Sequence, residues 1–330
     1  LQVAGYHMEP DITVHVGAQI QEAGSCVMPA RLFFDIVRKL PDEMVSITVD
    51  HKQQVSIRAG AAFFQITAMD SEDYPELPDV NGKSGVTMPQ SALKAMISGT
   101  IFSVSENQAR PIQTGCLMEV TEDSVTMVAV DSFRLARRTW HTENAANHTL
   151  KFVVPAAGLK EIERILEDSD EPVTFTLGDK HILFSIGDAL LVSRVLEGEF
   201  IDWRRIVPTN CGTVLTANVA ELTSSIERVS LIISEKVKSP VRCVFGDNMA
   251  DFRTANTIGS AHDTCSIAGN GGELEIGFNS RYLLDALRVI PSEEVTLELQ
   301  NGLSPIVFTP CDKKYDFAYM VLPVRLRSNS

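Results

Sequence analysis

The chain has 330 residues, of which 44% are apolar, 7% aromatic and 22% charged, and its formal net charge is -14. This length suits two or three domains better than one, and the absence of any run of 18 apolar residues argues against a membrane-spanning helix. The N-terminal residues lack the pattern of a signal peptide, and the six cysteines are scattered singly, as expected of free thiols in a reducing compartment. A soluble cytoplasmic protein is therefore predicted.

A short amphipathic helix followed by a strand recurs five times along the chain. The units start 60, 66, 63 and 61 residues apart, at Pro29, Pro89, Pro155, Asn218 and Asn279. In the first, third and fifth units an acidic turn and an alternating strand follow the helix, over residues 45–49, 173–177 and 295–299. Alternate units are about 125 residues apart, which is the size of a domain, so the spacing predicts three domains of like fold.

The alternation of helices and strands predicts an α+β fold in which antiparallel sheets carry the helices on one side. In the first helix the spacing of three and four residues predicts a core-facing side. That side consists of Phe33, Ile36, Val37 and Leu40. The glycines of Asn81-Gly82 and of residues 269–272 predict hairpin turns. Polar stretches that contain glycine place the domain boundaries so that the domains span residues 1–83, 84–211 and 212–330.

The first unit is shorter than the others. Only 28 residues precede Pro29, and the chain begins with Leu. The regular spacing predicts that roughly 30 to 45 N-terminal residues, with a sixth helix, are missing from this sequence, so that the first domain is incomplete. The alternative is a first domain that is naturally abbreviated.

The distribution of charge is uneven. A net charge of -14 argues against nucleic-acid binding only if the charges are evenly spread, because Lys and Arg side chains drive phosphate binding. The acidic residues gather in turns, whereas several basic residues lie on the polar faces of the repeated helices. The alternative is that both sets are ordinary solvated surface.

The chain shows no catalytic constellation and no pattern that would hold a metal or cofactor. None of its seven histidines falls in a metal-binding motif, and it has neither a nucleophile elbow nor a phosphate loop. An apolar segment near the C-terminus, residues 319–326, is interrupted by Pro323, which predicts that the chain leaves its sheet after Val321. This segment is either one wall of an apolar groove for a partner peptide or a last strand that covers its own core.

Three motifs resemble the bacterial DNA polymerase III β subunit, the sliding clamp. They are VAVDSFRLA at residues 128–136, FIDWRRIVP at 200–208 and VLPVRL at 321–326. The resemblance covers roughly residues 15–326 and implies three domains of like fold, with two helices per domain lining a hole and the sheets outside. It also implies that two chains join head to tail into a ring around duplex DNA.

The resemblance implies that the ring holds DNA by topology, with weak and sequence-independent phosphate contacts from the hole. The candidates for those contacts are Arg31, Arg38, Lys236, Lys238 and Arg242. It further implies a homodimer seam at which Phe64 and Ile66 of one chain meet Ile232 and Ile233 of the other.

The family's partner site is a groove that binds short linear motifs of the replicative polymerase, the clamp loader and repair proteins. At two of the corresponding positions, Phe133 stands where His is frequent and Ile201 where Pro is frequent. By correspondence of the motifs the groove comprises Gln113, Val130, Ser132, Phe133, Arg134, Leu135, Ile201, Arg205, Ile206, Tyr282, Leu303, Pro305, Met320, Leu322, Pro323, Val324 and Arg325.

The leading hypothesis is a non-enzymatic DNA sliding clamp, a processivity subunit of DNA polymerase that acts in the nucleoid. The alternative is a scaffold built from the same repeats that binds protein partners without encircling DNA. The tail at residues 327–330 either modulates the groove or is a disordered remnant.

Overall fold

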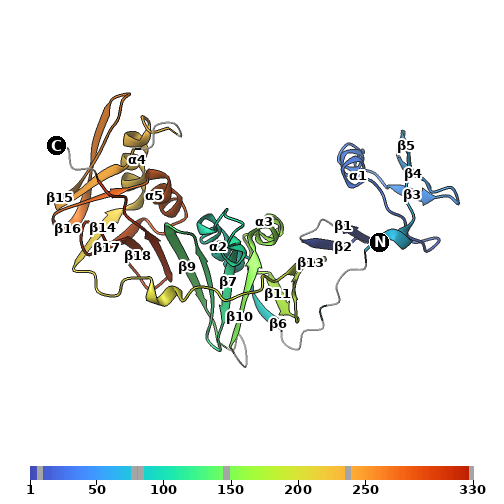
Figure 1. The fold of residues 1–330 in the computed structure, drawn as a ribbon. Coiled ribbons are helices and arrows are strands. Elements are labelled where there is room, and N and C mark those ends of the chain that lie inside the picture. Colours follow the sequence, from blue (N-terminus) through green and yellow to red (C-terminus); the bar gives the residue numbers. More distant parts are fainter. Residues whose placement is uncertain (6–9, 76–79, 81–84, 144–148, 235–238, 327–330) are drawn as a thin grey trace.

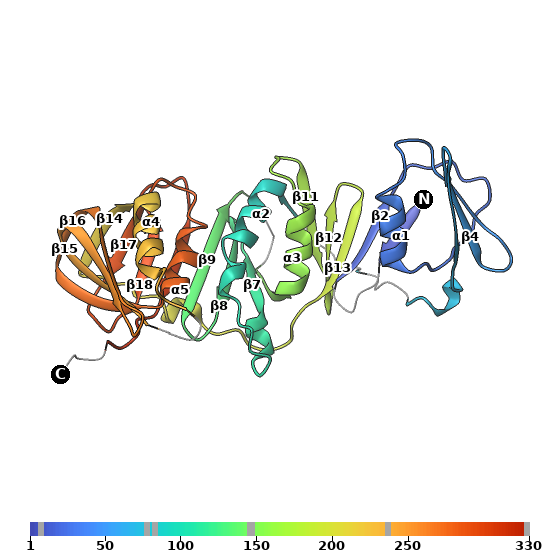
Figure 2. The same ribbon diagram turned by 90° about the horizontal axis from the view of Figure 1, so that it is seen from above.

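The computed structural model describes residues 1–5, 10–75, 80, 85–143, 149–234 and 239–326. These residues form three units that follow one another along an arc (Figure 1). The α-helices of the described residues lie on the concave side of the arc, and the sheets lie outside them, as both ribbon views show (Figure 1, Figure 2). The predicted α+β architecture of three like units is confirmed.

The helices begin where the repeat predicts. The first three helices are each directly preceded by a proline in extended backbone: Pro29, Pro89 and Pro155. Proline is tolerated at a helix start because the backbone N–H groups there have no partner within the helix, so no hydrogen bond is lost. Asn218 and Asn279 precede the last two, and each side-chain carbonyl accepts a hydrogen bond of 3.0 Å from a backbone N–H of the first turn. The helices are α1 (Ala30–Val37), α2 (Gln90–Ser98), α3 (Ala156–Ile165), α4 (Val219–Ser230) and α5 (Ser280–Leu287).

The strands fall into three consecutive groups, and β3, β11 and β17 confirm the strands predicted after the helices. The first unit contains β1 (Gln2–Gly5), β2 (Asp11–His15), β3 (Ser46–Val49), β4 (Gln54–Ala59) and β5 (Ala62–Thr67). The central unit contains β6 (Gly85–Pro89), β7 (Gly115–Val120), β8 (Ser124–Val130), β9 (Arg134–His141), β10 (Leu150–Pro155), β11 (Pro172–Leu177), β12 (His181–Ile186) and β13 (Ala189–Arg194). The third unit contains β14 (Thr213–Asn218), β15 (Val241–Ala255), β16 (Ser260–Phe278), β17 (Glu294–Leu299), β18 (Ile306–Pro310) and β19 (Phe317–Val321).

Short 3-10 helices connect some of these strands. They are η1 (Ser71–Asp73), η2 (Ile101–Ser103), η3 (Pro111–Thr114) and η4 (Trp203–Arg205).

The sheets cross from one unit into the next. A ten-stranded sheet has the order β10-β7-β8-β9-β19-β18-β17-β14-β16-β15, so that β9 of the central unit pairs with β19 of the third. A six-stranded sheet, β1-β2-β13-β12-β11-β6, joins the first and central units through the pairing of β2 with β13. Strands β3, β4 and β5 form a separate sheet, in which β3 and β5 are the edges. The pairing is antiparallel throughout these sheets.

Apolar cores fill the space between the helices and the sheets. The third unit packs Leu222 and Ile226 of α4 against Phe245 and Phe278, all at most 2% exposed. The core of the first unit is the smallest, and in it only Ile36 of the predicted inner face of α1 is buried. Phe33 and Leu40 pack partly against that core, whereas Val37 is 46% exposed.

The hairpin predicted at residues 269–272 is wrong. These residues lie inside the long strand β16, at an irregularity where its pairing with β15 shifts between Phe245 and Met249. Gly269 and Gly272 have positive φ, and a Cβ at Gly271 would lie 2.3 Å from the carbonyl oxygen of Phe245. The glycines therefore allow a bulge and a close backbone approach within a strand. The other predicted turn, Asn81-Gly82, lies outside the described residues.

The C-terminal segment leaves the sheet after Val321, as Pro323 predicts. The Leu322 N–H donates to the Phe133 carbonyl at 2.8 Å, and the Val324 N–H donates to the Gly277 carbonyl at 2.7 Å. A Cβ at Gly277 would lie 2.6 Å from Leu326, so the segment can approach β16 closely because this position is Gly. Leu322 and Leu326 are half-buried as a result.

Candidate partner groove and DNA-facing surface

An apolar cluster lies on the outer face of the ten-stranded sheet, away from the helices. Alternate residues of β8 separate the two faces: Met127 and Ala129 pack in the helix-side core, whereas Val128 and Val130 belong to the outer cluster. The buried members of the outer cluster are Leu117, Val128, Val130, Leu135, Val153, Phe200, Val307, Ala318 and Met320. Strands of both the central and the third unit contribute, so the cluster crosses the boundary between them.

The structure brings several predicted groove residues together at this cluster. Val130, Leu135 and Met320 are buried in it, and Ile206 packs against it from the segment that connects β13 to β14. Phe133 is 53% exposed and stacks on Tyr282 of α5, with 5.8 Å between the ring centroids. The central and third units thus both contribute residues to one apolar surface. Surfaces of this kind can bind the apolar side chains of a peptide.

The remaining predicted groove residues differ in their degree of exposure. Leu303 is 77% exposed, Ile201 42% and Val324 41%. Ser132, Arg205 and Arg325 are also exposed, and Gln113, Pro305, Leu322 and Pro323 are half-buried.

Arg134 differs from the other predicted groove residues because its charge is engaged in ion pairs that are largely buried, whereas the Arg205–Asp202 pair is exposed. Its side chain is only 10% exposed and pairs with Asp131 at 3.0 Å and with Asp285 of α5 at 2.5 Å. Its guanidinium also lies 4.6 Å from the centroid of the Tyr282 ring. Arg134 therefore joins the two walls of the surface.

The candidate DNA contacts are spread over two faces of the molecule. Arg31 of α1 and Arg38, which directly follows α1, are both exposed, and the helix α1 lies on the concave side of the arc (Figure 1). Arg242 lies on β15, between Val241 and Cys243, which pack beneath α4, so its side chain points to the opposite face and pairs with Glu275. Lys236 and Lys238 lie outside the described residues.

Acidic partners accompany most of the basic side chains on the other helices. Lys94 pairs with Asp168 at 3.3 Å and Arg164 with Glu161 at 2.6 Å. The further pairs are Arg228–Asp263, Arg281–Asp285 and Arg288–Glu227. The concave face consequently presents mostly charges that are balanced in pairs.

The chain is similar along most of its length to proteins of one kind. The β sliding clamp of Staphylococcus epidermidis is 31% identical over 309 residues, which is 93% of this chain and 81% of the relative. Models of the N-terminal, central and C-terminal domains of the DNA polymerase III β subunit match residues 1–78, 87–202 and 204–325 in that order. The chain belongs to the DNA polymerase III β subunit family. Its function is accordingly that of a DNA sliding clamp, a non-catalytic subunit, and the scaffold alternative is not favoured.

Solved clamps have the same fold. A putative DNA polymerase III β subunit from Eubacterium rectale superposes with a TM-score of 0.93 at 32% identity, covering 98% of this chain and 87% of that one. A sliding clamp from Pseudomonas aeruginosa, in a structure bound to griselimycin, gives a TM-score of 0.91 at 28% identity over 98% of this chain and 88% of its own.

The residues predicted for the dimer seam of the clamp lie at the two ends of the arc (Figure 1). Phe64 and Ile66 are half-buried on β5, an edge strand of the first unit. Ile232 and Ile233 follow Leu231, the C-cap of α4, in the third unit, and the Asn256 side chain donates to the Ile232 carbonyl at 2.9 Å. Within one chain these two pairs of residues do not come together.

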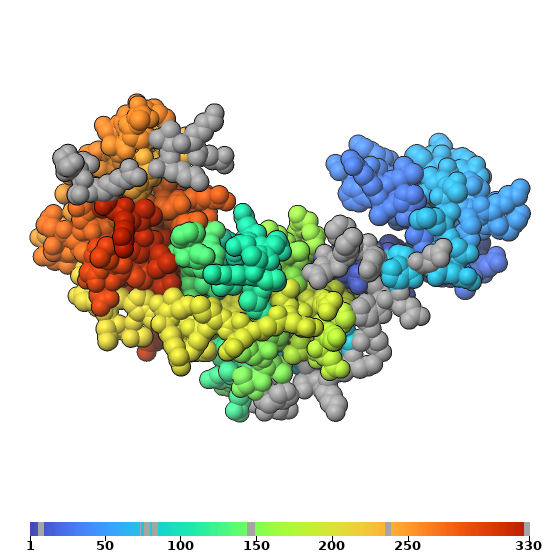
Figure 3. Space-filling view, viewed as in Figure 1, coloured from blue at the N-terminus to red at the C-terminus, as the bar shows by residue number. Residues whose placement is uncertain are grey.

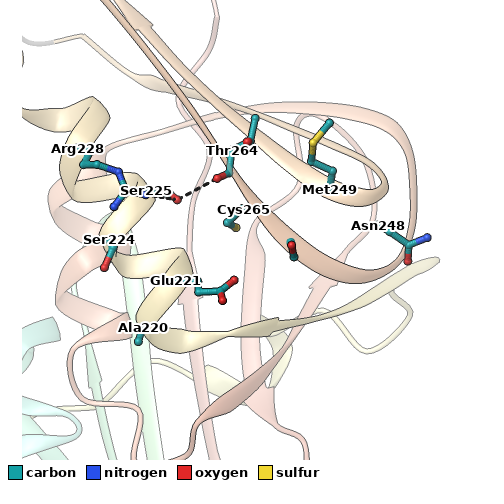
Figure 4. Close-up of a pocket in the computed structure, with 10 residues that line it drawn as sticks. Ala220, Glu221, Ser224, Ser225, Arg228, Asn248, Met249, Thr264 and Cys265 are labelled. Atoms are coloured by element: carbon teal, nitrogen blue, oxygen red, sulfur yellow. Dashed lines mark hydrogen bonds between the residues drawn. The ribbon is translucent and has the colours of Figure 1, made fainter.

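A cavity of about 530 Å³ opens in the third unit, between α4 and the bulged part of the β15–β16 pair (Figure 4). Arg228 and Glu221 of α4 line one side, and Thr264 and Cys265 of β16 line the other. The Ser225 hydroxyl donates to the Thr264 carbonyl across its edge at 3.4 Å. Burial raises the pKa of the Cys265 thiol to about 11, so this cysteine is an uncharged wall of the cavity.

Two absences can be stated for the described residues. No group of three or more His, Cys, Asp or Glu side chains there is arranged to hold a metal ion. None of the helices there is long and apolar enough to cross a membrane.

The family motifs contain Trp203 and Arg204, but they do not include the residues outside the groove that contact them or join the two units, namely Glu119, Arg137 and Asp316. Glu119, Trp203 and Arg204 form one hydrogen-bonded cluster, and Arg137 of β9 pairs with Asp316 at 2.6 Å across the unit boundary. Glu119 could have been noticed in the sequence because it is an acidic residue in an otherwise apolar strand. No local signal pairs Arg137 with Asp316, because 179 residues separate them in the sequence.

Proposed function

We propose that two copies of this clamp join head to tail into a ring around duplex DNA. The observation that supports the ring is a free strand edge at each end of the arc. Strand β5 pairs only with β4, and residues 260–266 of β16 pair only with β15 among the described residues. Pairing β5 of one copy with β16 of the next would satisfy both edges, and repeating it would close a symmetric dimer.

Apolar contacts at the same ends support this seam. In the proposed dimer Phe64 and Ile66 contact Ile232 and Ile233 of the second copy, and Leu231 there is 83% exposed in the single chain. The cavity beside α4 lies next to the free edge of β16, where it would receive side chains of the docking strand. Burial of such side chains contributes roughly 1.5–3 kcal/mol each before ordering costs.

We propose that duplex DNA passes along the helix-lined concave face and is held mainly by closure of the ring. Arg31 and Arg38 would contribute weak phosphate contacts there, and the balanced charges of the other helices would add little. We place the protein in the cytoplasm with the chromosome, because a clamp acts on DNA during replication.

We propose that the outer apolar surface is the groove that tethers the replicative polymerase, the clamp loader and repair proteins. The exposed side chains of Phe133, Ile201 and Val324 around a buried apolar floor support this assignment. We further propose that griselimycin, which is bound to the relative from P. aeruginosa, binds this surface in the present chain. We propose domain boundaries at residues 83 and 211; the first falls between the ranges that the N-terminal and central models match, whereas the C-terminal model begins at residue 204, ahead of the second.

Light scattering and DNA capture test the ring. The chain of 36.2 kDa should form a dimer that, once loaded, remains on circular duplex DNA and slides off the linearised form. Ile232→Asp should give a monomer that is not retained, whereas Val214→Asp, which alters an apolar residue of β14 with 59% exposure, should still form the ring. A monomeric wild-type chain that still binds griselimycin would instead favour the scaffold.

A further inference from the structure

The segment that connects the central and third units crosses the outer face of the sheet with little backbone support. In the space-filling view it runs, in yellow, along the lower part of the third unit and across the front of the central unit (Figure 3). At its start the Leu196 N–H donates to the Val153 carbonyl at 2.9 Å. From residue 197 to residue 212 the backbone–backbone hydrogen bonds among described residues occur only within and next to η4. Side chains must therefore position this segment.

Apolar packing supplies part of that positioning. Phe200 is 4% exposed in the outer cluster, and Trp203, Ile206 and Val207 pack against it. Such contacts hold the segment against the sheet but are non-directional, so they do not set the orientation of η4.

Glu119 supplies a directional contact. It lies on β7, is 7% exposed, and accepts hydrogen bonds from Nη2 of Arg204 at 2.7 Å, from Nη1 of Arg204 at 3.3 Å and from the Trp203 indole N–H at 3.4 Å. Burial alone would raise the pKa of Glu119, but Arg204, Lys151 and the Trp203 N–H outweigh it and hold that pKa below its ordinary value. The carboxylate is therefore charged at neutral pH and makes charge-assisted hydrogen bonds.

The partners of Glu119 are also fixed to one another. The Arg204 guanidinium lies over the Trp203 ring, 4.3 Å from its centroid, and that of Arg137 lies 6.0 Å from the same centroid. Both partners belong to η4, which also contains Arg205 and is followed directly by Ile206. One buried carboxylate thus orients the short helix that presents two of the proposed groove residues.

We propose that Glu119 is a positioning residue for partner binding: by holding Trp203 and Arg204 it sets the η4 wall of the groove. It touches no partner itself. This inference rests on the groove assigned above, and it adds a residue that the family motifs do not point to. A preorganised wall spares the partner the cost of ordering the segment, so loosening η4 should weaken binding without unfolding the chain.

Three variants and one spectroscopic signal test the inference, with griselimycin and a peptide of the polymerase motif as the probes. Glu119→Gln should weaken binding of both probes about tenfold, and Arg204→Gln about fivefold, because each removes the charge-assisted bond. Together they should weaken binding no more than Glu119→Gln alone, since they remove one shared interaction. Lys151→Gln is the matched control: its Nζ is 3.5 Å from the same carboxylate, but it lies on β10 and not on the segment, so binding should change less than about twofold.

Trp203 fluorescence distinguishes positioning from a general loss of stability. The chain has two tryptophans, so Trp140→Phe leaves Trp203 as the reporter. In that background Glu119→Gln and Arg204→Gln should shift the emission of Trp203 to longer wavelength as its ring becomes more accessible to water, at an unchanged thermal midpoint. If Glu119→Gln does not fold, Arg204→Gln decides alone, because this side chain is 59% exposed and tolerates replacement.

The outcomes separate this inference from the groove assignment. Unchanged probe affinity in Glu119→Gln and Arg204→Gln, with the wild-type chain binding normally, would overturn the positioning role and leave the groove intact. A wild-type chain that binds neither probe would overturn the groove, and the inference with it. Equal weakening in Lys151→Gln would also overturn it, because the effect would then follow from surface charge alone.

Discussion

Arg134 and Asp285 join two units of the arc through a charge-assisted hydrogen bond, with 2.5 Å between Nη1 of the arginine and Oδ2 of the aspartate. Asp131 binds the same guanidinium at 3.0 Å, so one arginine lies between a carboxylate of the central unit and one of α5. The side chain is 10% exposed, and its removal would leave two acidic groups facing each other in a partly buried site.

The first prediction concerns this pair. Arg134→Met keeps most of the volume but removes the charge, and it should lower the free energy of unfolding by about 3 kcal/mol, because Asp131 and Asp285 lose their common partner. Urea unfolding would measure the loss. Arg281→Met is the control, since Arg281 lies 3.9 Å from the same Asp285 and is 75% exposed; it should cost no more than about 0.5 kcal/mol. Equal costs would contradict the role given to Arg134.

The second prediction concerns acid stability. Burial would raise the pKa of Asp316, but the hydrogen bond and charge of Arg137, together with those of His141, outweigh burial and hold this pKa below its ordinary value. The resulting stability is fully present above the unfolded pKa of about 3.9 and is lost as the pH falls through the folded pKa. Asp316→Asn should lower stability by about 1–2 kcal/mol at pH 7 and flatten its dependence on pH below about 4.

Denaturation across a pH series would check that expectation. Asp168→Asn is the matched control, because Asp168 pairs with Lys94 while being 84% exposed. It should change stability by less than about 0.5 kcal/mol and leave the loss of stability at low pH unchanged. If Asp316→Asn loses stability at low pH in the same way as the wild-type chain, other carboxylates determine the acid sensitivity.

The third prediction concerns the groove. Leu322→Asp and Val324→Asp place a charge on the C-terminal wall and should each weaken binding of griselimycin or of the polymerase-motif peptide more than about tenfold, because apolar anchors would meet a carboxylate. Fluorescence anisotropy would measure the affinity. Met44→Asp, at an 83% exposed position of the first unit, should leave it unchanged. Retained affinity in both groove variants would place the partner site elsewhere.

The fourth prediction concerns salt. If Arg31 and Arg38 contact phosphates, the double replacement by Ala should reduce the slope of log affinity against log salt by up to about 1.8, since each contact contributes about 0.9 for duplex DNA. Titration of linear DNA at several salt concentrations would give the slope. Arg242→Ala should leave it unchanged, because Arg242 is paired with Glu275 on the face away from the helices. If Arg242→Ala reduced the salt slope as much as the replacement of Arg31 and Arg38 does, the DNA would lie on the other face.

The elements that could be predicted from the sequence are those with local causes. The helices begin at the predicted prolines and asparagines because capping and the apolar spacing are written within a few residues. The pairing of β9 with β19 could not be predicted in this way, because it joins segments about 180 residues apart. The wrong prediction of a hairpin at residues 269–272 has the same origin. Glycines indicate an unusual backbone conformation, but whether it is a turn or a bulge depends on the pairing with the neighbouring strand.

The candidate groove could be predicted only in part. Family motifs located Val130, Leu135 and Met320, and the structure brings these residues into one cluster. The motifs also included Arg134, but its engagement in two ion pairs depends on α5, which is distant in sequence. The contact of Glu119 with Trp203 and Arg204 likewise spans about 84 residues, so it was outside the reach of any local pattern.

The strand pairing between β9 and β19 also bears on how the molecule comes apart. Because hydrogen bonds of one sheet run from the central unit into the third, neither unit can lose its sheet without exposing an unpaired edge of the other. Amide protons of these two units should therefore exchange with solvent as one cooperative block. The small sheet β3-β4-β5, with its own limited core, should open earlier and independently of that block.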